Sequence, residues 1–111
     1  MSARHRGSKD RNHDELADAF RALGCTVVDL HDANRPGFPD VLVGCIGSDH
    51  LVEFKNPETA YGRAGMTAEQ SVFARDWRGG SVSVATCSED VVALVSRWRK
   101  DPYLKLPQGE R

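Results

Sequence analysis

Two β-rich runs lie close together between residues 37 and 55, and this stretch constrains the fold more than any other part of the chain. The runs span residues 41–46 and 50–54, and Gly47, Ser48 and Asp49 separate them. Small polar residues between two β-rich runs are typical of a hairpin turn. The sequence therefore predicts two adjacent antiparallel strands in this stretch.

Three charged residues are expected to meet at one rim of this hairpin. Asp40 opens the first strand, and Glu53 and Lys55 lie near the end of the second strand, which returns beside it. Side chains alternate between the two faces of a strand, so Glu53 and Lys55 are expected on one face. Their neighbours Val52 and Phe54 then point into a core on the other face.

Two carboxylates and one ammonium group suit chemistry on a phosphodiester. Mg²⁺ prefers oxygen ligands and is commonly held by one or two carboxylates together with substrate phosphate oxygens. Asp40 and Glu53 supply such carboxylates. A bound metal polarises a phosphoryl oxygen and lowers the pKa of a bound water. Lys55 can hold the attacking water or offset charge on the pentavalent phosphate.

Each part of this pattern also has a structural interpretation. Proline and aspartate are common turn residues, so Pro39 and Asp40 need serve no other purpose. Glu53 and Lys55 can belong to a solvated strand face. Their joint occurrence around one predicted hairpin favours the metal site.

The residues of this stretch carry a family resemblance. Pro39-Asp40 followed by Glu53-Phe54-Lys55 resembles the PD-(D/E)XK nuclease signature. A wider pattern is similar to the virus-type replication-repair nuclease domain, VRR-NUC, and covers the chain from about residue 15 to the last helix. This pattern comprises residues 37–40, 53–55, 62–63 and 66–70.

The resemblance implies a Mg²⁺-dependent nuclease, with Mn²⁺ able to substitute, that acts on branched DNA such as Holliday junctions. It implies that Asp40 and Glu53 bind the metal, with the backbone carbonyl of Phe54 as a third ligand, and that Lys55 serves the attacking water. Members of the family often act as homodimers. Cutting both strands of a junction with one site per chain also calls for a two-fold dimer.

Two further residues are candidates for the catalytic site. The family has a helical acid before the first strand that reaches the metal, and Glu15 is the best match here. A glutamine at the position of Gln70 faces the metal site in the family. Both residues also fit capping boxes, Asn12 with Glu15 and Thr67 with Gln70, which explain them without catalysis.

The segment 58–65 contains two glycines and has no periodicity, so it is predicted to be a loop. It starts beside the candidate site. Tyr61 and Arg63 are therefore candidates to stack on a base or bind a phosphate of the substrate. A surface loop without contact to substrate is the alternative.

Composition indicates a single domain. The chain has 111 residues, 40% hydrophobic and 28% charged, and a formal net charge of -1, which by itself does not indicate nucleic-acid binding. Residues 1–13 carry four basic residues against one acid, and such an arm can follow phosphates or remain solvated. We expect a basic arm at 1–13, the domain at 14–100 and a tail at 101–111.

Three widely spaced cysteines, Cys25, Cys45 and Cys87, form no Cys-x-x-Cys pair. Their odd number argues against a disulfide framework, so they are expected to be buried thiols in a reducing cytoplasm. No apolar segment approaches the length of a membrane span, and the N-terminus lacks the apolar stretch of a signal peptide. A cytoplasmic protein without a membrane partner is expected.

The pattern of elements predicts an α/β fold, a small mixed sheet of about four strands flanked by helices. The resemblance implies that this is a restriction-endonuclease-like core. A right-handed crossover makes the last strand parallel to an earlier one, and the last helix is expected to cover the sheet or form a dimer interface. Helices are predicted at 14–23, 67–78 and 89–99, and strands at 25–30, 41–46, 50–54 and 81–85.

Three other functions remain open. The same fold can cut flaps, nicks or plain duplex rather than junctions. An inactive DNA-binding or assembly protein can retain the fold, although Asp40, Glu53 and Lys55 are all present. The hairpin charges can also decorate an unrelated α/β interaction module. Thermal stabilisation by Ca²⁺ or Mg²⁺ that vanishes in Asp40→Ala would separate the first of these from the third.

Overall fold

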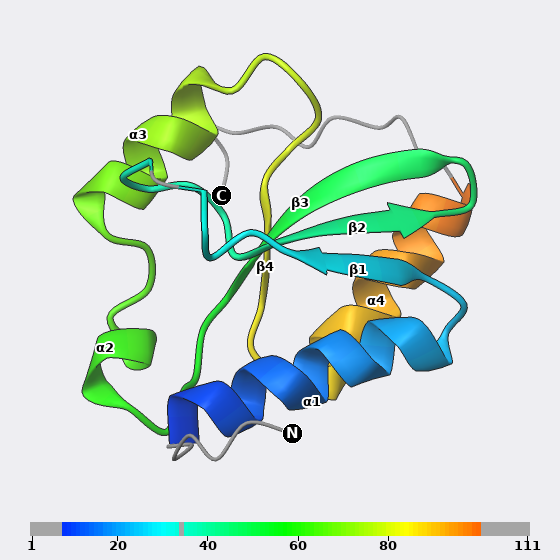
Figure 1. The fold of residues 1–111 in the computed structure, drawn as a ribbon, viewed down its shortest axis with the longest axis horizontal. Helices are drawn as coiled ribbons and strands as arrows, with labels where there is room; N and C mark the ends of the chain where they lie inside the picture. Colours follow the sequence, from blue (N-terminus) through cyan, green and yellow to red (C-terminus); the bar gives the residue numbers. More distant parts are fainter. Residues whose placement is uncertain (1–7, 34, 101–111) are drawn as a thin grey trace.

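A four-stranded mixed sheet with helices on both faces forms the body of the protein (Figure 1). The computed structural model describes residues 8–33 and 35–100. The elements in chain order are α1 (Ser8–Ala22), β1 (Thr26–Asp29), β2 (Val41–Cys45), β3 (Ser48–Phe54), α2 (Ala60–Arg63), α3 (Ala68–Asp76), β4 (Ser83–Ala85) and α4 (Ser88–Lys100).

The strands lie in the order β1-β2-β3-β4. Strand β2 is antiparallel to both of its neighbours, β1 and β3, and β4 is parallel to β3. The predicted mixed α/β sheet and the parallel last strand are therefore confirmed. The register pairs Val41 with Val52, which brings the start of β2 beside the end of β3.

The hairpin turn is shorter than predicted and lies earlier in the chain. Ile46 and Gly47 form it, with φ angles of 52° and 81°. Positive φ at both central residues belongs to the two-residue turn whose twist matches that of the flanking strands. The predicted turn at Gly47, Ser48 and Asp49 is wrong, because Ser48 and Asp49 already belong to β3.

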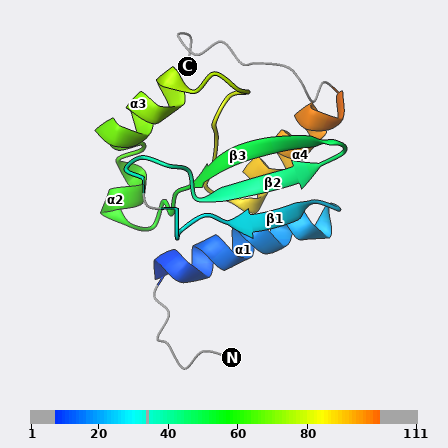
Figure 2. The same ribbon diagram turned by 45° about the horizontal axis from the view of Figure 1, so that its top comes forward.

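The main core lies between the sheet and the helices α1 and α4. Figure 2 shows α1 running beneath the strands. Phe20 of α1 stacks on Phe54 and on Trp98 of α4, with ring centroids 6.3 and 5.8 Å apart. Val41 and Val52 of the sheet are fully buried against them. The last helix therefore covers the sheet, as one of the two alternatives predicted.

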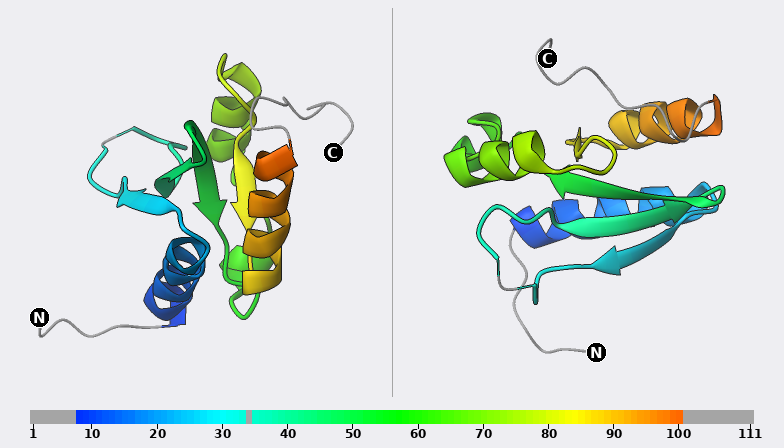
Figure 3. Two further views of the ribbon diagram at one scale, coloured as in Figure 1. Left: turned by 90° about the vertical axis from the view of Figure 1, so that its right-hand side faces the viewer. Right: turned by 90° about the horizontal axis from the view of Figure 1, so that it is seen from above.

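A smaller core lies on the opposite face of the sheet, under α3. Leu51, Phe73 and Val82 are its buried members. Since Leu51 precedes Val52 on one strand, the two residues face opposite sides. In the right-hand view of Figure 3, α3 and α4 lie at opposite ends of the sheet. Part of this second face is left exposed, including Val28.

Two predicted elements differ from the structure, the first helix and the loop at 58–65. Helix α1 begins at Ser8 rather than at residue 14, so Asn12 lies inside the helix and cannot cap it. The predicted loop 58–65 contains the short helix α2, capped by Thr59, whose hydroxyl accepts a hydrogen bond from the Gly62 N–H at 2.9 Å. The predicted tail at 101–111 and most of the basic arm lie outside the described residues.

Among the described helices, none is both long enough and apolar enough to cross a membrane.

Candidate active site

Asp40 is held between two strands at the rim of the sheet. Its carboxylate Oδ2 accepts a hydrogen bond of 2.7 Å from the backbone N–H of Phe54 on β3. Its carbonyl oxygen accepts one of 2.8 Å from the N–H of Leu30, just after β1. The antiparallel register pairs Val41 with Val52, so the preceding residue, Asp40, falls opposite Glu53. The hairpin therefore delivers Asp40 to the end of β3, as the sequence predicted.

Gly37 fixes the path of the loop that leads to Asp40. Its φ angle is +79°, and a Cβ atom there would lie 2.6 Å from the carbonyl carbon of Glu69 in α3. Only glycine combines this φ with so close an approach of two backbones. The loop before Asp40 is thus packed directly on the first turn of α3.

Glu53 and Lys55 are buried charged residues on the face of β3 that α3 covers. Each is 3% exposed, and the Lys55 Nζ lies 3.6 Å from the Glu53 Oε2. A buried ion pair needs hydrogen bonds to its remaining groups, because removing two charges from water is costly. The alternative interpretation, in which Glu53 and Lys55 belong to a solvated strand face, is therefore wrong.

Gln70 supplies those hydrogen bonds from α3. Its Oε1 accepts from the Lys55 Nζ at 2.7 Å and from the Thr67 N–H at 2.9 Å. Its Nε2 donates to the Glu53 Oε2, and its backbone N–H donates to the Thr67 Oγ1 at 3.1 Å. The capping box and the contact with the charged pair are therefore made by one amide group.

A narrow cleft of about 30 Å³ opens beside Lys55. The Lys55 Nζ lies 4.6 Å from the centroid of the Tyr61 ring, a distance at which an ammonium group is attracted to an aromatic face. The lining residues are Asn12, His13, Asp40, Phe54, Lys55, Asn56, Thr59 and Tyr61. Asp40, Lys55 and Tyr61 therefore line one cleft, whereas Glu53 is not among its lining residues.

Helix α1 reaches this cleft with Asn12 rather than with Glu15. The Asn12 Nδ2 donates to the Lys55 carbonyl oxygen at 3.1 Å. Glu15 is exposed and lines a separate hollow of about 400 Å³, together with residues that include Thr86 and Ser88. The structure thus removes the capping explanation of Glu15, and its catalytic role stays a prediction.

Arg63 also lies away from the cleft. It is exposed, and its Nη1 donates to the Pro57 carbonyl oxygen at 3.1 Å. The glycine before it, Gly62, is buried, and a Cβ atom there would overlap the carbonyl group of Asn56. Gly62 therefore lets α2 pack onto the end of β3, which brings Tyr61 to Lys55 while Arg63 remains on the surface.

Sequence reasoning missed four residues of the cleft, namely Asn12, His13, Asn56 and Thr59. Asn12 was expected to cap a helix. His13 packs edge-on against the Phe54 ring, with centroids 5.0 Å apart and an interplanar angle of 77°. Asn56 is 8% exposed, and its Oδ1 accepts from the Glu58 N–H at 2.9 Å. Only Asn56 carried a signal, since asparagine before proline is typical of a turn.

The oxygen donors of the site suit Mg²⁺ in kind. Within residues 8–33 and 35–100, no group of three or more His, Cys, Asp or Glu side chains is arranged to hold a metal. Asp40 and Glu53 offer two carboxylates, and Phe54 between Glu53 and Lys55 offers a carbonyl oxygen. Mg²⁺ is usually bound by one or two carboxylates while keeping several waters, so this donor set fits the ion.

No protein-family model, curated protein or solved structure matches the chain. The resemblance to VRR-NUC nucleases therefore depends on the motif residues and on how they are arranged.

Proposed function

We propose that the chain is a Mg²⁺-dependent endodeoxyribonuclease of the VRR-NUC type, with a restriction-endonuclease-like core. It hydrolyses phosphodiester bonds in branched DNA such as Holliday junctions, and Mn²⁺ can replace Mg²⁺. One observation carries this proposal, the buried network of Glu53, Lys55 and Gln70 next to Asp40. Buried ion pairs contribute little net stability, so a functional reason for keeping this one is favoured.

Asp40, Glu53 and the Phe54 carbonyl would hold the metal. The bound ion would polarise a phosphoryl oxygen and lower the pKa of a water ligand. Lys55 orients the attacking water or stabilises negative charge on the phosphate, since its ammonium group lines the cleft beside Asp40. Gln70 positions Lys55 and Glu53 through its amide, and Glu15 is a further supporting acid.

The substrate side of the site is formed by α2. Tyr61 lies over the Lys55 ammonium group and is 54% exposed, so its ring is available to a sugar or base of the DNA. Arg63 is exposed one residue from Gly62 and is a phosphate contact. We further propose that the protein acts in the cytoplasm and as a homodimer, because one chain provides one site for the two strands of a junction.

Cleavage assays test this function directly. A labelled four-way junction, a splayed arm and a linear duplex are each incubated with Mg²⁺, Mn²⁺ or EDTA, with the wild-type chain and with Lys55→Ala. Metal-dependent cutting that is lost in Lys55→Ala is the expected result. The ranking of the three substrates then separates junction cutting from flap or general duplex cutting. A folded wild-type chain that cuts none of them would contradict the nuclease, and binding without cutting would indicate an assembly protein.

A further inference from the structure

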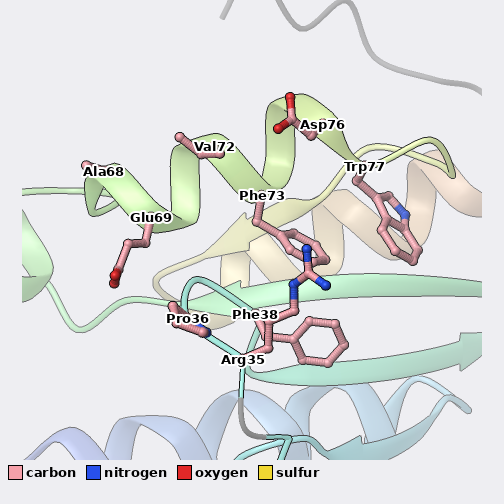
Figure 4. Close-up of a pocket in the computed structure, with 9 residues that line it drawn as sticks. All are labelled: Arg35, Pro36, Phe38, Ala68, Glu69, Val72, Phe73, Asp76 and Trp77. Carbon is pink, nitrogen blue, oxygen red and sulfur yellow. The ribbon is translucent and has the colours of Figure 1, made fainter.

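Another hollow, distinct from the cleft beside Lys55 and from the hollow lined by Glu15, lies between α3 and the loop that leads to Asp40. Its volume is about 400 Å³. Its walls include Arg35 and Phe38 from the loop and Glu69, Phe73 and Trp77 from α3 (Figure 4). We call it the Trp77 pocket. Pockets that bind small ligands commonly have volumes of 300–1,000 Å³, so this one is large enough for a planar ring system.

Aromatic rings in this pocket form a short stack. The rings of Phe73 and Trp77 are 5.3 Å apart at an interplanar angle of 18°. Phe38 meets the Phe73 ring edge-on at 5.2 Å, and the guanidinium carbon of Arg35 lies 5.6 Å from the Phe73 centroid. Figure 4 shows the Phe73 ring of α3 beside Arg35 and the Trp77 indole beyond it, just past the end of the helix.

Trp77 ends this stack and is 40% exposed, whereas the second tryptophan, Trp98, is 5% exposed in the main core. Gly79 leaves room for the indole, since a Cβ atom at Gly79 would be 2.5 Å from the Trp77 Nε1 and would push the ring aside. A positioned, exposed indole is a surface on which a planar base can stack, and such stacking is tolerant of base identity.

The Trp77 pocket shares no lining residue with the cleft beside Lys55, but the two segments that line it lead into the candidate active site. Its loop wall ends at Asp40, and on its helix wall Glu69 is followed directly by Gln70. The loop and the helix touch where Gly37 approaches the Glu69 carbonyl group. Trp77 follows Gln70 by seven residues, about 10 Å along the helix, so a base stacked there would belong to a nucleotide near a phosphate held at Asp40.

Charge in the pocket favours a base over a phosphate. Two acidic residues, Glu69 and Asp76, line it together with one basic residue, Arg35, and Figure 4 shows the Asp76 carboxylate pointing away from Phe73 and Phe38. Asp76 is paired with Arg75, whose Nε lies 2.8 Å from its Oδ1. Carboxylates repel phosphate oxygens but accept hydrogen bonds from the amino groups of bases. A neutral planar ring fits this lining better than the DNA backbone does.

We propose that the Trp77 pocket binds an unpaired nucleobase of the DNA substrate, stacked on the Trp77 indole. The inference rests on the proposed nuclease function and refines its substrate to branched DNA that carries unpaired bases beside the scissile phosphate. Fully paired duplex offers no such base. A splayed arm should therefore bind more tightly than duplex of the same length.

Binding of a short labelled thymidine oligomer, compared with an abasic phosphate oligomer of the same length, tests the pocket in EDTA. The wild-type chain should prefer the thymidine oligomer by about tenfold, the size expected of one stacked base. Trp77→Leu should abolish the part of the preference that Trp77 supplies and leave only what Tyr61 adds. Gly79→Ala should weaken it by displacing the indole, while Gly80→Ala should not, because nothing lies within 4 Å of a Cβ atom at Gly80.

Equal binding of the two oligomers by the wild-type chain would overturn the proposal, and so would a preference that is as large in Trp77→Leu as in the wild-type chain. A change of oligomeric state in Trp77→Leu, with the base preference unaltered, would assign the pocket to a protein contact instead. The nuclease is assayed separately with Mg²⁺. Cutting without base preference would refute the pocket alone, and base preference without cutting would refute the nuclease alone.

Discussion

Gln70 is the residue on which the candidate site depends most, because one amide group joins the start of α3 to two buried charges. We predict that Gln70→Ala lowers the free energy of unfolding by about 2 kcal/mol, since Lys55 and Glu53 each lose a hydrogen-bond partner. Urea unfolding followed by circular dichroism measures the change.

Thr67→Ala is the matched control for Gln70. It removes the hydroxyl that accepts from the Gln70 N–H but leaves the amide contacts with Lys55 and Glu53 in place. A lost helix cap costs about 1 kcal/mol, so Thr67→Ala should be the milder variant. Equal losses in both variants would show that the contacts with the charged pair contribute nothing to stability.

Lys55 offers a way to separate stability from catalysis. Lys55→Met leaves the Glu53 carboxylate, 4% exposed at its side chain, without its cation, and breaking a buried pair in this way costs about 3 kcal/mol. Adding Glu53→Gln removes the second charge, so the double variant should regain most of that stability. Neither variant should cut DNA. Unfolding curves and the cleavage assay are measured on the same preparations, and cutting by the double variant would refute the catalytic role of the pair.

The sequence allowed part of this site to be predicted. Asp40, Glu53 and Lys55 could be predicted to meet at one rim because the second run returns beside the first, although the register could not, since the turn lies at Ile46 and Gly47. The burial of Glu53 and Lys55 could not be predicted, since it depends on α3 packing over β3 from a distant part of the chain. Asn12 was misjudged for the same reason, because its partner is the Lys55 carbonyl oxygen.

At the scale of elements, the turn of the β2–β3 hairpin carries an avoidable strain. Ile46 is 54% exposed and has a φ of 52°, a left-handed conformation that costs a β-branched residue about 1 kcal/mol or more. Asparagine adopts it readily. Ile46→Asn should therefore raise the free energy of unfolding by about 1 kcal/mol, measured by urea unfolding.

Val28 provides the control for Ile46. It is also 54% exposed, but it lies within β1 and has no positive φ. Val28→Asn replaces a good strand former by a poor one and should not stabilise the protein. If Ile46→Asn and Val28→Asn both raise the free energy of unfolding, the gain comes from removing an exposed apolar side chain. The explanation by backbone strain at Ile46 would then be refuted.

The same elements show why boundaries were harder to predict than order. Strand positions followed from alternation and turn residues, but Ile46 gave no signal of a turn because its side chain is typical of strands. Helix α1 extends back to Ser8 through a polar segment that lacks an apolar stripe. Helix α2 is a single turn fixed by the Thr59 cap and by Gly62 packing on Asn56, and neither contact has a periodicity to detect.

At the scale of the whole molecule, the mixed sheet with a parallel last strand follows from general rules. A strand that returns through α3 crosses over to lie parallel to its neighbour, since such crossovers are right-handed. The distribution of helices over the two faces did not follow from the sequence. Helices α1 and α4 share the main core while α3 covers only part of the other face, and this depends on how the three helices pack together.

Metal binding is the property of the whole molecule that most directly tests the site. A ligand that binds only the native state raises the free energy of unfolding, by about 2.7 kcal/mol at a hundredfold excess over its Kd. Mg²⁺ or Ca²⁺ should therefore raise the Tm of the wild-type chain, and EDTA should reverse the rise. Asp40→Ala removes one proposed ligand. The Tm of this variant should therefore be the same with metal and with EDTA, even if the substitution itself changes the Tm.

Asp49→Ala is the control that distinguishes this site from general charge screening. Asp49 is an exposed carboxylate at the far end of the same hairpin, so its loss changes the net charge as Asp40→Ala does without touching the rim near Lys55. It should keep the full metal-dependent shift. An equal shift in Asp40→Ala and wild type would mean that the ions bind elsewhere, and the proposed carboxylate pair would then have to be abandoned as the metal site even if the chain cuts DNA.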